Sequence, residues 1–597
     1  LVIVVVFLPL TISGGTIGNI LKEFAIPIIA ATLTSLLVSF TVTPLLMSRF
    51  GKLSDDTRPT LSARFSRTVE KAFENIKDFY VRILSFGLKY KILILTATIV
   101  LLIGSFTLFP MGLIGVAFVP EIDQGEFKIS LDMNPQITVY QNNQITIQVE
   151  KILLGKPEIQ RVYTNVGSDG NGFGSASKNN ATSISVKMVD KKDRDTDVHE
   201  FAQQIKQEIM TIPGIRARVS VAGLVGGGGI APIQLIVQGA DYEKVEVAAA
   251  MLLETVKKTP GTADAKLSID DPKQEVQVKL NRDKMSQLGL SSADVGSALR
   301  VALAGNNDSK YTDGNYEYNI RVGVDNFDKT NVADVSKLTL LNNRGELIEL
   351  NQIAGISYGL GPSMLERTNR IASIAVSSNV VGRPSGTVGS EIMTAIAGQI
   401  PEGVTIQASG MMEQQSKAFG SLGISFLSAI VLIYLIMVVL YNSLSDPLVV
   451  LVSIPLSFIG AFLALGLTLN ELSIFSIIGL IVLIGLVAKN AILLVDFTNH
   501  IRSEQNMDTF HALIEAGKER LRPILMTTFA MIFGMLPIAL ATGNGAELKN
   551  GMAWVIIGGL TSSMLLTLVV VPVVYYCVDR IKVRFRREKC NLVSSVC

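Results

Sequence analysis

A lysine stands inside one of the most apolar stretches of the chain. The segment "GLVAKNAILLVDF", residues 485–497, places Lys489 after seventeen uncharged residues, 472–488. A lysine near the centre of a membrane helix costs about 2.5–3.5 kcal/mol on insertion scales, so it persists where a charged partner or a wet cavity offsets that cost. The alternative is snorkelling, but Lys489 lies about 13–14 Å of helix before Thr498, which makes that path strained. The pattern favours a functional lysine.

Two further polar residues are spaced for one helix face. Arg520 and Thr527 in "RLRPILMTTFAMIFGMLPIALATG" are seven residues apart, which is two helical turns. If Arg520 begins its helix at the cytoplasmic boundary, the pair could lead water or protons toward Lys489; anchoring on lipid headgroups is the other role open to this arginine. Asn490 could hydrogen-bond to another helix, although it faces about 100° away from Lys489. Asp496 is interpreted as an interfacial residue outside the site.

These residues must be positioned by membrane helices. The 597 residues are 48% hydrophobic and 17% charged, and the apolar residues cluster in runs of membrane-spanning length. We predict spans at 23–48, 91–110, 419–441, 447–468, 472–497, 523–542 and 552–578, plus a shorter run at 2–11. The composition therefore indicates a polytopic membrane protein.

The distribution of basic residues predicts the orientation. They collect between Arg49 and Arg67, between Arg502 and Arg522, and in "RIKVRFRREK" after the last span, and the positive-inside rule places these segments in the cytoplasm. Residues 113–417 then face the other side. That stretch contains no cysteine, which suits a bacterial periplasm without requiring a disulfide. The net charge of +2 implies no nucleic-acid partner.

Two membrane segments resemble each other without a gap. Pro9 and Pro44 align with Pro537 and Pro572, so both pairs are 35 residues apart and the offset is 528. Repeated membrane halves with a polar site between them are typical of transporters. The chain opens inside an apolar run without a methionine, and we interpret it as N-terminally truncated, with the counterpart of Lys489 upstream of residue 1.

The 300 residues between the spans change their hydrophobic period. Strands and helices alternate in the order βαββαβ from residue 126 to about 221, which is the ferredoxin-like unit. A second such unit begins after the glycines at 226–229 and resumes at 371–408. A smaller subdomain, 272–366, is therefore inserted into it, and its polar stretch 306–319 predicts an exposed hairpin or loop.

The loop "GSDGNGFGSASKNN", 167–180, joins two central strands of the first unit. Its glycines provide mobility, and Phe173 is the one aromatic residue among them. On composition alone, the loop is a surface loop with a stray phenylalanine.

The order of spans, the paired ferredoxin-like units, "FVPEIDQGEF", "GLVAKNAILLVDF" and "RLRPILMTTFAMIFGMLPIALATG" together resemble the resistance-nodulation-division (RND) efflux transporters, hydrophobe/amphiphile branch. The resemblance implies that Lys489 lies beside two intramembrane aspartates, which would precede residue 1, and that Arg520 and Thr527 complete a proton relay. It also implies that Phe173 and Tyr163 contact substrate. The expected activity is proton-driven efflux of amphiphilic compounds by the inner-membrane permease of a tripartite pump.

The resemblance further implies a division of the chain and its partners. The implied divisions are a partial first repeat at 1–48, a cytoplasmic connector with an amphipathic helix at 49–90, a span at 91–112, porter-type subdomains at 113–228 and at 229–271 with 367–410, a docking-type subdomain at 272–366, five spans at 411–579 and a basic tail at 580–597. The expected partners are a periplasmic adaptor, an outer-membrane channel and two further copies in a homotrimer.

Two alternatives compete with this hypothesis. A heavy-metal exporter would use a methionine cluster, since thioethers suit Cu(I) and Ag(I), but Met133 and Met188 lie on predicted strands and core packing is favoured for both. A non-transporting membrane scaffold or sensor is the second. An enzyme is not expected, because the sequence holds no nucleophile elbow, phosphate loop or metal-ligand spacing; no cofactor or resident metal is expected either.

Overall fold

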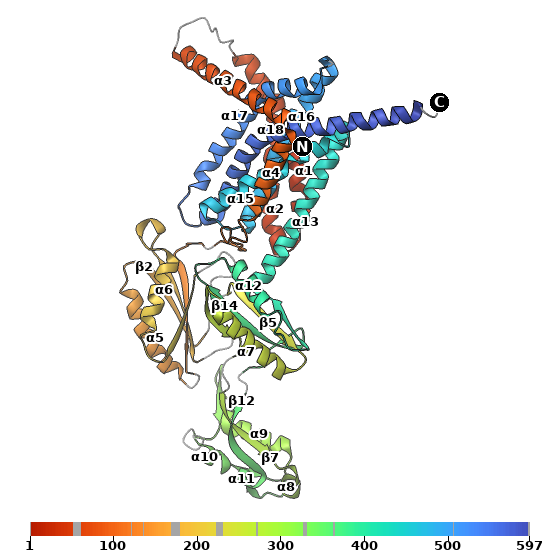
Figure 1. Ribbon diagram of the computed structural model, residues 1–597. Helices are drawn as coiled ribbons and strands as arrows, with labels where there is room; N and C mark the ends of the chain where they lie inside the picture. The colour runs from red at the N-terminus through yellow and green to blue at the C-terminus, as the bar shows by residue number, and fades with distance from the viewer. Residues whose placement is uncertain are drawn as a thin grey trace. The chain divides into compact units, whose positions relative to one another are not determined.

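The computed structural model describes residues 2–12, 14–51, 61–120, 122–134, 137–168, 179–221, 231–269, 273–325, 331–361, 364–505 and 507–594 (Figure 1). The chain forms two compact units. The first comprises Leu1–Val237, Glu246–Lys266 and Ala375–Cys597, and the second comprises Gln238–Val245 and Leu267–Ile374.

The apolar runs form long helices. Among the described residues, six helical segments are long and apolar enough to cross a membrane: Leu21–Phe50, Gly410–Tyr441, Asp446–Thr468, Ile474–Gln505, Thr509–Ala539 and Glu547–Arg584. They belong to α2 (Gly15–Phe50), α13 (Gly410–Tyr441), α14 (Asp446–Leu451) with α15 (Ser453–Thr468), α16 (Ile474–Gln505), α17 (Thr509–Ala539) and α18 (Glu547–Ser594). The short helix α1 (Val2–Ile12) precedes them.

The connector before the expected span at 91–110 is a separate helix. The amphipathic α3 (Leu61–Lys89) and the apolar α4 (Lys91–Phe106) meet at a bend of 98° beside Tyr90. The buried Tyr80 hydroxyl of α3 donates to the carbonyl of Leu568 on α18, at 2.9 Å. This contact ties the amphipathic helix to the bundle.

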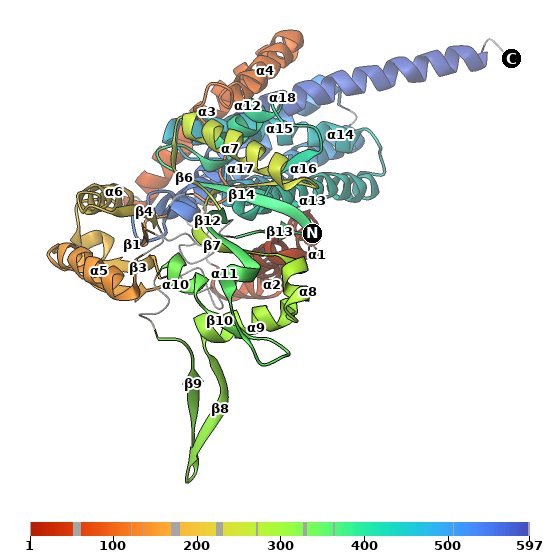
Figure 2. The same cartoon turned by 90° about the horizontal axis from the view of Figure 1, so that it is seen from below.

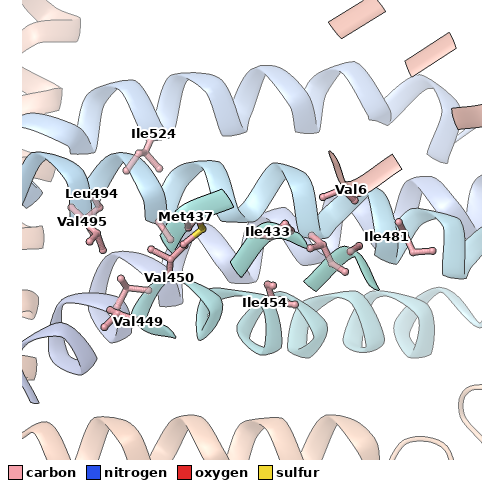
Figure 3. Close-up of a cluster of buried hydrophobic side chains, with 14 of the residues drawn as sticks. Val6, Ile433, Met437, Val449, Val450, Ile454, Ile481, Leu494, Val495 and Ile524 are labelled. Atoms are coloured by element: carbon pink, nitrogen blue, oxygen red, sulfur yellow. The ribbon is translucent and has the colours of Figure 1, made fainter. Parts of the chain in front are cut away.

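Two features hold the helices together. A shared apolar core contains side chains from α1, α13, α15, α16 and α17, with Val6, Ile433, Ile454, Ile481 and Ile524 among its members (Figure 3). The other feature is a close approach of α15 and α18, where a Cβ built on Gly460 would lie 2.1 Å from the carbonyl oxygen of Gly558. Small residues allow such backbone approach between membrane helices.

The first α+β subdomain has the expected strand order. It consists of β1 (Glu126–Met133), α5 (Val139–Leu154), β2 (Ile159–Val166), β3 (Ala181–Met188), the 3-10 turn η1 (Lys191–Asp193), α6 (Val198–Ile209) and β4 (Ile215–Val221). The antiparallel sheet has the order β2-β3-β1-β4, and α5 and α6 cover one face of it (Figure 1). Ile129, Leu131 and Ile184 are fully buried in the resulting core.

The second α+β subdomain repeats this topology. Its elements are β5 (Ile233–Gly239), α7 (Tyr242–Lys258), β6 (Thr262–Leu267), β13 (Arg367–Thr368), β14 (Ile371–Val380), α12 (Ser385–Ile396) and β15 (Val404–Ala408). The sheet order is β13-β14-β5-β15, with β6 also paired to β14. The central order β6-β14-β5-β15 corresponds to β2-β3-β1-β4 of the first subdomain.

The inserted segment contains β7 (Lys273–Leu280), α8 (Arg282–Gln287), α9 (Ser292–Ala304), β8 (Asn306–Asp313), β9 (Tyr316–Val322), α10 (Val332–Ser336), β10 (Thr339–Leu341), β11 (Leu347–Glu349), α11 (Leu350–Ile353) and β12 (Ala354–Gly361). Strand β7 pairs with β12, and Val295, Leu350 and Ile353 lie in the core. The β8–β9 hairpin extends away from α8 and α9 (Figure 2). A helical polytopic protein with two ferredoxin-like subdomains and an insertion is confirmed as the fold class.

Candidate functional site

Lys489 lies on the more exposed side of α16, the side that also carries the exposed Asp496 two turns further on. Its neighbours Ala488 and Asn490 are buried in the bundle, whereas Lys489 itself is exposed. Among the residues that the structure describes, the Lys489 ammonium group forms no hydrogen bond or ion pair with another side chain. Because the residues before and after it lie in apolar surroundings, an additional acidic group at this face would gain a strong electrostatic partner.

The face of α16 that carries Lys489 is close to α1. Gly485 lies one turn before Lys489, and a Cβ built on it would lie 3.5 Å from Ile3 and 3.7 Å from Val6. Residues four apart share a helix face, so Lys489 projects on the side that α1 covers one turn earlier. The two acidic partners expected upstream of residue 1 stay a prediction.

The polar contact between α16 and α17 involves the residues adjacent to two of the expected ones. The Asn490 amide donates to the Thr528 hydroxyl at 3.5 Å, the long end of the hydrogen-bond range, and both residues are buried. The expectation that Asn490 bonds to another helix is confirmed. Thr527 instead donates to the carbonyls of Pro523 and Ile524 in its own helix, at 3.0 and 3.2 Å.

Arg520 lies against an aromatic ring. Its Cζ is 4.4 Å from the ring centroid of Phe497 on α16, and its Nε is buried without a hydrogen-bond partner among the described atoms. Phe497 was not singled out by the sequence, where it reads as one more apolar residue of the span. The sequence feature that could have identified Phe497 is its position, about two helical turns beyond Lys489.

The two contacts define how α16 and α17 are aligned. Seven residues separate Asn490 from Phe497 on α16, and eight separate Arg520 from Thr528 on α17. The two helices are therefore antiparallel neighbours, and nearly the same length of each helix separates the two contacts. Thr527 and Thr528 lie level with Lys489 and Asn490, while Arg520 lies about 12 Å further along the helix axis.

A polar network closes the end of the bundle beyond Arg520. Arg502 donates to the Tyr575 hydroxyl at 2.9 Å and pairs with Asp579 at 3.0 Å. Asp446 accepts from Lys582 at 2.6 Å. These links join α14, α16 and α18 at the side that the basic residues mark as cytoplasmic. The sequence showed the charges but not their pairing.

A short extended segment after α4, Ile114–Phe118, is bonded to two distant parts of the chain. Leu472 donates its N–H to Gly115 O at 2.7 Å and accepts from Ala117 N at 3.3 Å, and Ile474 N donates to Phe118 O at 3.2 Å. These contacts join the segment to the start of α16. We refer to Ile114–Phe118 as the strap.

The other edge of the strap contacts α12. Gly386 N donates to Val116 O at 3.0 Å, and Val116 N donates to the Thr387 hydroxyl at 3.3 Å. A Cβ on Gly115 would lie 2.0 Å from Pro384 Cγ, so the backbone here approaches α12 too closely for a larger residue. The strap therefore connects the helix of Lys489 to a helix of the second α+β subdomain.

A second connection uses side chains of the first α+β subdomain. Lys191 Nζ lies 2.7 Å from Glu547 Oε1 at the start of α18. Burial would lower the pKa of Lys191, but the hydrogen bond and negative charge of Glu547 outweigh it and raise that pKa. Nearby, Asp123 pairs with Arg194, and both side chains are almost fully buried.

The Asp123–Arg194 pair fixes the base of the same subdomain. Burial alone would raise the pKa of Asp123, but the hydrogen bond and charge of Arg194, together with the Gly125 N–H, hold it below its ordinary value. The two α+β subdomains are themselves joined by Lys206 and Asp264, whose charged atoms lie 2.6 Å apart.

The expected substrate contacts are only partly visible. Tyr163 lies on the edge strand β2, is 67% exposed and is paired with the exposed Ser185 of β3 on the open face of the sheet. Phe173 falls outside the described residues. The role of Tyr163 and Phe173 in substrate binding therefore stays a prediction.

The described residues include no group of three or more His, Cys, Asp or Glu that could hold a metal ion. Met133 and Met188 are 6% and 1% exposed and belong to the apolar core of the first α+β subdomain. Core packing, as expected for both methionines, is confirmed.

Long apolar helices, a charged residue within one of them and two ferredoxin-like subdomains define the architecture of a membrane transporter. The sequence matches the AcrB/AcrD/AcrF family over residues 1–579, so the chain belongs to this family of RND efflux permeases. It is an inner-membrane protein with a large periplasmic domain.

Solved structures agree with this assignment. Two crystal forms of a heavy metal efflux pump superimpose with TM-scores of 0.79 and 0.78, both at 22% sequence identity. In each case the match covers 97% of this chain and 57% of the solved chain. At that identity the likeness establishes the fold, and the chain spans little more than half the length of these relatives.

Proposed function

We propose that the protein exports amphiphilic or hydrophobic compounds in exchange for protons, as part of an inner-membrane permease. The observation that carries the proposal is Lys489, an exposed cation within the long apolar helix α16 of an RND permease. Neighbouring carboxylates would be favoured as ions beside it. Their protonation would weaken the pairing and shift the helices between two arrangements.

The strap supports a route for this shift. Movement of the start of α16 would displace the main chain at Leu472 and Ile474, which is bonded directly to the strap. The strap in turn holds the first turn of α12 through Val116. Proton-dependent changes at Lys489 would thus reach the second α+β subdomain through one continuous set of hydrogen bonds, with no flexible linker in between.

The experiment compares Lys489→Met with Lys549→Met, a matched substitution of an exposed lysine at the start of α18. The protein is expressed from its own gene in cells without other efflux pumps, at matched levels, and accumulation of a fluorescent amphiphilic cation is followed. Export should be lost in Lys489→Met and with a protonophore, and kept in Lys549→Met. Undiminished export by Lys489→Met would reject the proposal.

Export of soft metal ions is the second candidate. The observation that favours it is the superposition on a heavy metal efflux pump. The burial of Met133 and Met188 gives no support for a thioether site at those positions. Measuring cell-associated silver and copper in the same strains separates the candidates, because metal export without dye export would exclude the amphiphile hypothesis. A scaffold would export neither.

The proposed partners are a periplasmic adaptor, an outer-membrane channel and two further copies of the protein. The β8–β9 hairpin supports a subunit contact, since Tyr311, Tyr316, Tyr318 and Val322 are all more than half exposed on it. Exposed aromatic residues are typical of interfaces. Cysteines placed at Tyr311 and Tyr316 test this by cross-linking in intact cells, where a ladder that ends at three subunits is expected.

A further inference from the structure

The contact between Phe497 and Arg520 bears directly on the proposed relay. An arginine stays protonated at every physiological pH, so Arg520 cannot itself release the transported proton. Its contribution is a fixed positive charge, and the effect of a fixed charge depends on where it is held. The mechanism therefore depends on which group holds the Arg520 charge in place.

The described surroundings of Arg520 contain one clear partner. The guanidinium carbon lies 4.4 Å from the centroid of the Phe497 ring, well inside the cation–π range of about 6 Å. No carboxylate is paired with this arginine among the described ion pairs, and its Nε is buried without a hydrogen bond among described atoms. Among the described groups, the Phe497 ring face is thus the one that holds the Arg520 charge in place.

The Phe497–Arg520 contact lies on the cytoplasmic side of Lys489 and joins two helices. Phe497 lies eight residues beyond Lys489 on α16, or about 12 Å toward the cytoplasmic end. Arg520 comes from the antiparallel α17, so the contact also joins the two helices whose relative position would change during proton exchange. A shift of α17 relative to α16 would move the Arg520 guanidinium away from the Phe497 ring, or it would move the guanidinium and the ring together.

We propose that Phe497 is a positioning residue of the proton relay: its ring holds the Arg520 guanidinium at the cytoplasmic end of the path to Lys489. The inference rests on the proposed proton-driven function. It predicts that an aromatic ring is required at this position, whereas an aliphatic side chain of similar volume is insufficient.

The test measures dye export by Phe497→Leu, Phe497→Tyr and Phe497→Trp at matched expression. Phe497→Leu should reduce the export rate about threefold to tenfold, the range expected for loss of a partly desolvated cation–π contact. The tyrosine and tryptophan variants should restore it. Export by Phe497→Leu at the wild-type rate would overturn the inference.

A double-mutant cycle with Arg520→Ala separates positioning from packing. If Phe497 acts through Arg520, then Phe497→Leu should cause no further loss in the Arg520→Ala background; an equal loss in both backgrounds would overturn the inference. Because the Phe497 ring also lies 6.4 Å from the His500 ring, His500→Ala is the control background, in which the leucine effect should persist.

A measurement that does not depend on transport distinguishes failure of the proposed proton-driven export from failure of the proposed Phe497–Arg520 contact. Thermal unfolding of the purified full chain in detergent measures the stability of each variant of the double-mutant cycle. The effects of Phe497→Leu and Arg520→Ala on stability are also expected to be coupled. If the wild type exports nothing or Lys489→Met exports normally, the proposed function fails, and additive stability losses then reject the contact as well. Normal Lys489 dependence with additive losses rejects the Phe497 inference alone.

Discussion

Lys191 in the first α+β subdomain and Glu547 at the start of α18 form an ion pair of 2.7 Å across 356 residues of sequence. Glu547 lies in the first turn of its helix, where a negative charge is favoured by the helix dipole. The pair therefore connects a periplasmic subdomain to the last membrane helix at a position where both charges are stabilised.

The pair predicts a dependence of stability on alkaline pH. Because the pKa of Lys191 is raised in the folded protein, its contribution is complete below the ordinary lysine pKa of about 10.4 and is lost as the pH rises through the higher folded value. Lys191→Met should remove the contribution, about 0.5–1 kcal/mol, at neutral pH. Unfolding by urea is measured at pH 8 and pH 11, with Lys192→Met as the exposed control. Equal pH profiles for the variant and the wild type would contradict the prediction.

Asp123 predicts an effect at the opposite end of the pH scale. Its pKa is lowered in the fold, so its stabilisation is complete above the ordinary value of about 3.9 and disappears as the pH falls through the lower folded pKa. Asp123→Asn leaves the buried Arg194 charge uncompensated and should cost about 3–5 kcal/mol. Resistance to protease during urea unfolding tests this. Asp195→Asn, at an exposed neighbour, should change little.

The approach of Gly460 to Gly558 predicts a steric requirement in the membrane. A methyl group at Gly460 would lie 2.1 Å from a carbonyl oxygen, so Gly460→Ala must separate α15 from α18. A cost of about 1–3 kcal/mol is expected, as for overpacking in other cores. Thermal unfolding in detergent measures it. Gly534→Ala is the control, since nothing lies within 4 Å of its added methyl group, and equal unfolding temperatures would rule out the contact.

Gly115 predicts a loss of coupling. Gly115→Ala places a methyl group 2.0 Å from Pro384 and should displace the strap from α12, lowering export about threefold to tenfold. Gly104→Ala, on α4 with free space around it, should export normally.

Thr387→Val gives a milder version of this change. It keeps the shape of the side chain and removes only the hydrogen bond from Val116, so a smaller loss is expected. Initial export rates are compared with thermal stability, because a defect in coupling lowers the rate while the fold is kept. A rate for Gly115→Ala equal to that of Gly104→Ala would show that the strap does not transmit the movement.

The elements with a clear period were predictable from the sequence. The long apolar runs of α13 to α18 and the βαββαβ order of β1 to β4 follow from local hydrophobic patterns. Lys489 stood out for the same reason, because a charge in an apolar run is a local anomaly. The hydrogen bond of Asn490 to a neighbouring helix was predictable because a buried amide needs a hydrogen-bond partner.

The contacts between distant segments were not predictable in this way. Thr528 contacts Asn490 where Thr527 does not, and one residue is a rotation of 100° that depends on how α17 packs. The pairing of Lys191 with Glu547, the ring beneath Arg520 and the strap all join residues far apart in the sequence. No local pattern specifies them, and they include the contacts on which the proposed coupling depends.

The strap has a consequence for how this sequence can vary among relatives. Five described hydrogen bonds join the strap to α12 and to the start of α16; four of them use main-chain atoms on both sides, and the fifth needs only a hydroxyl at Thr387. The half-buried side chain at Val116 can therefore change during evolution without breaking these hydrogen bonds, whereas Ala117 and Phe118 are constrained by burial, and Gly115 and Gly386 must stay small. A linkage of this kind leaves almost no trace in residue identities, so two permeases with little sequence in common can retain the same mechanical connection.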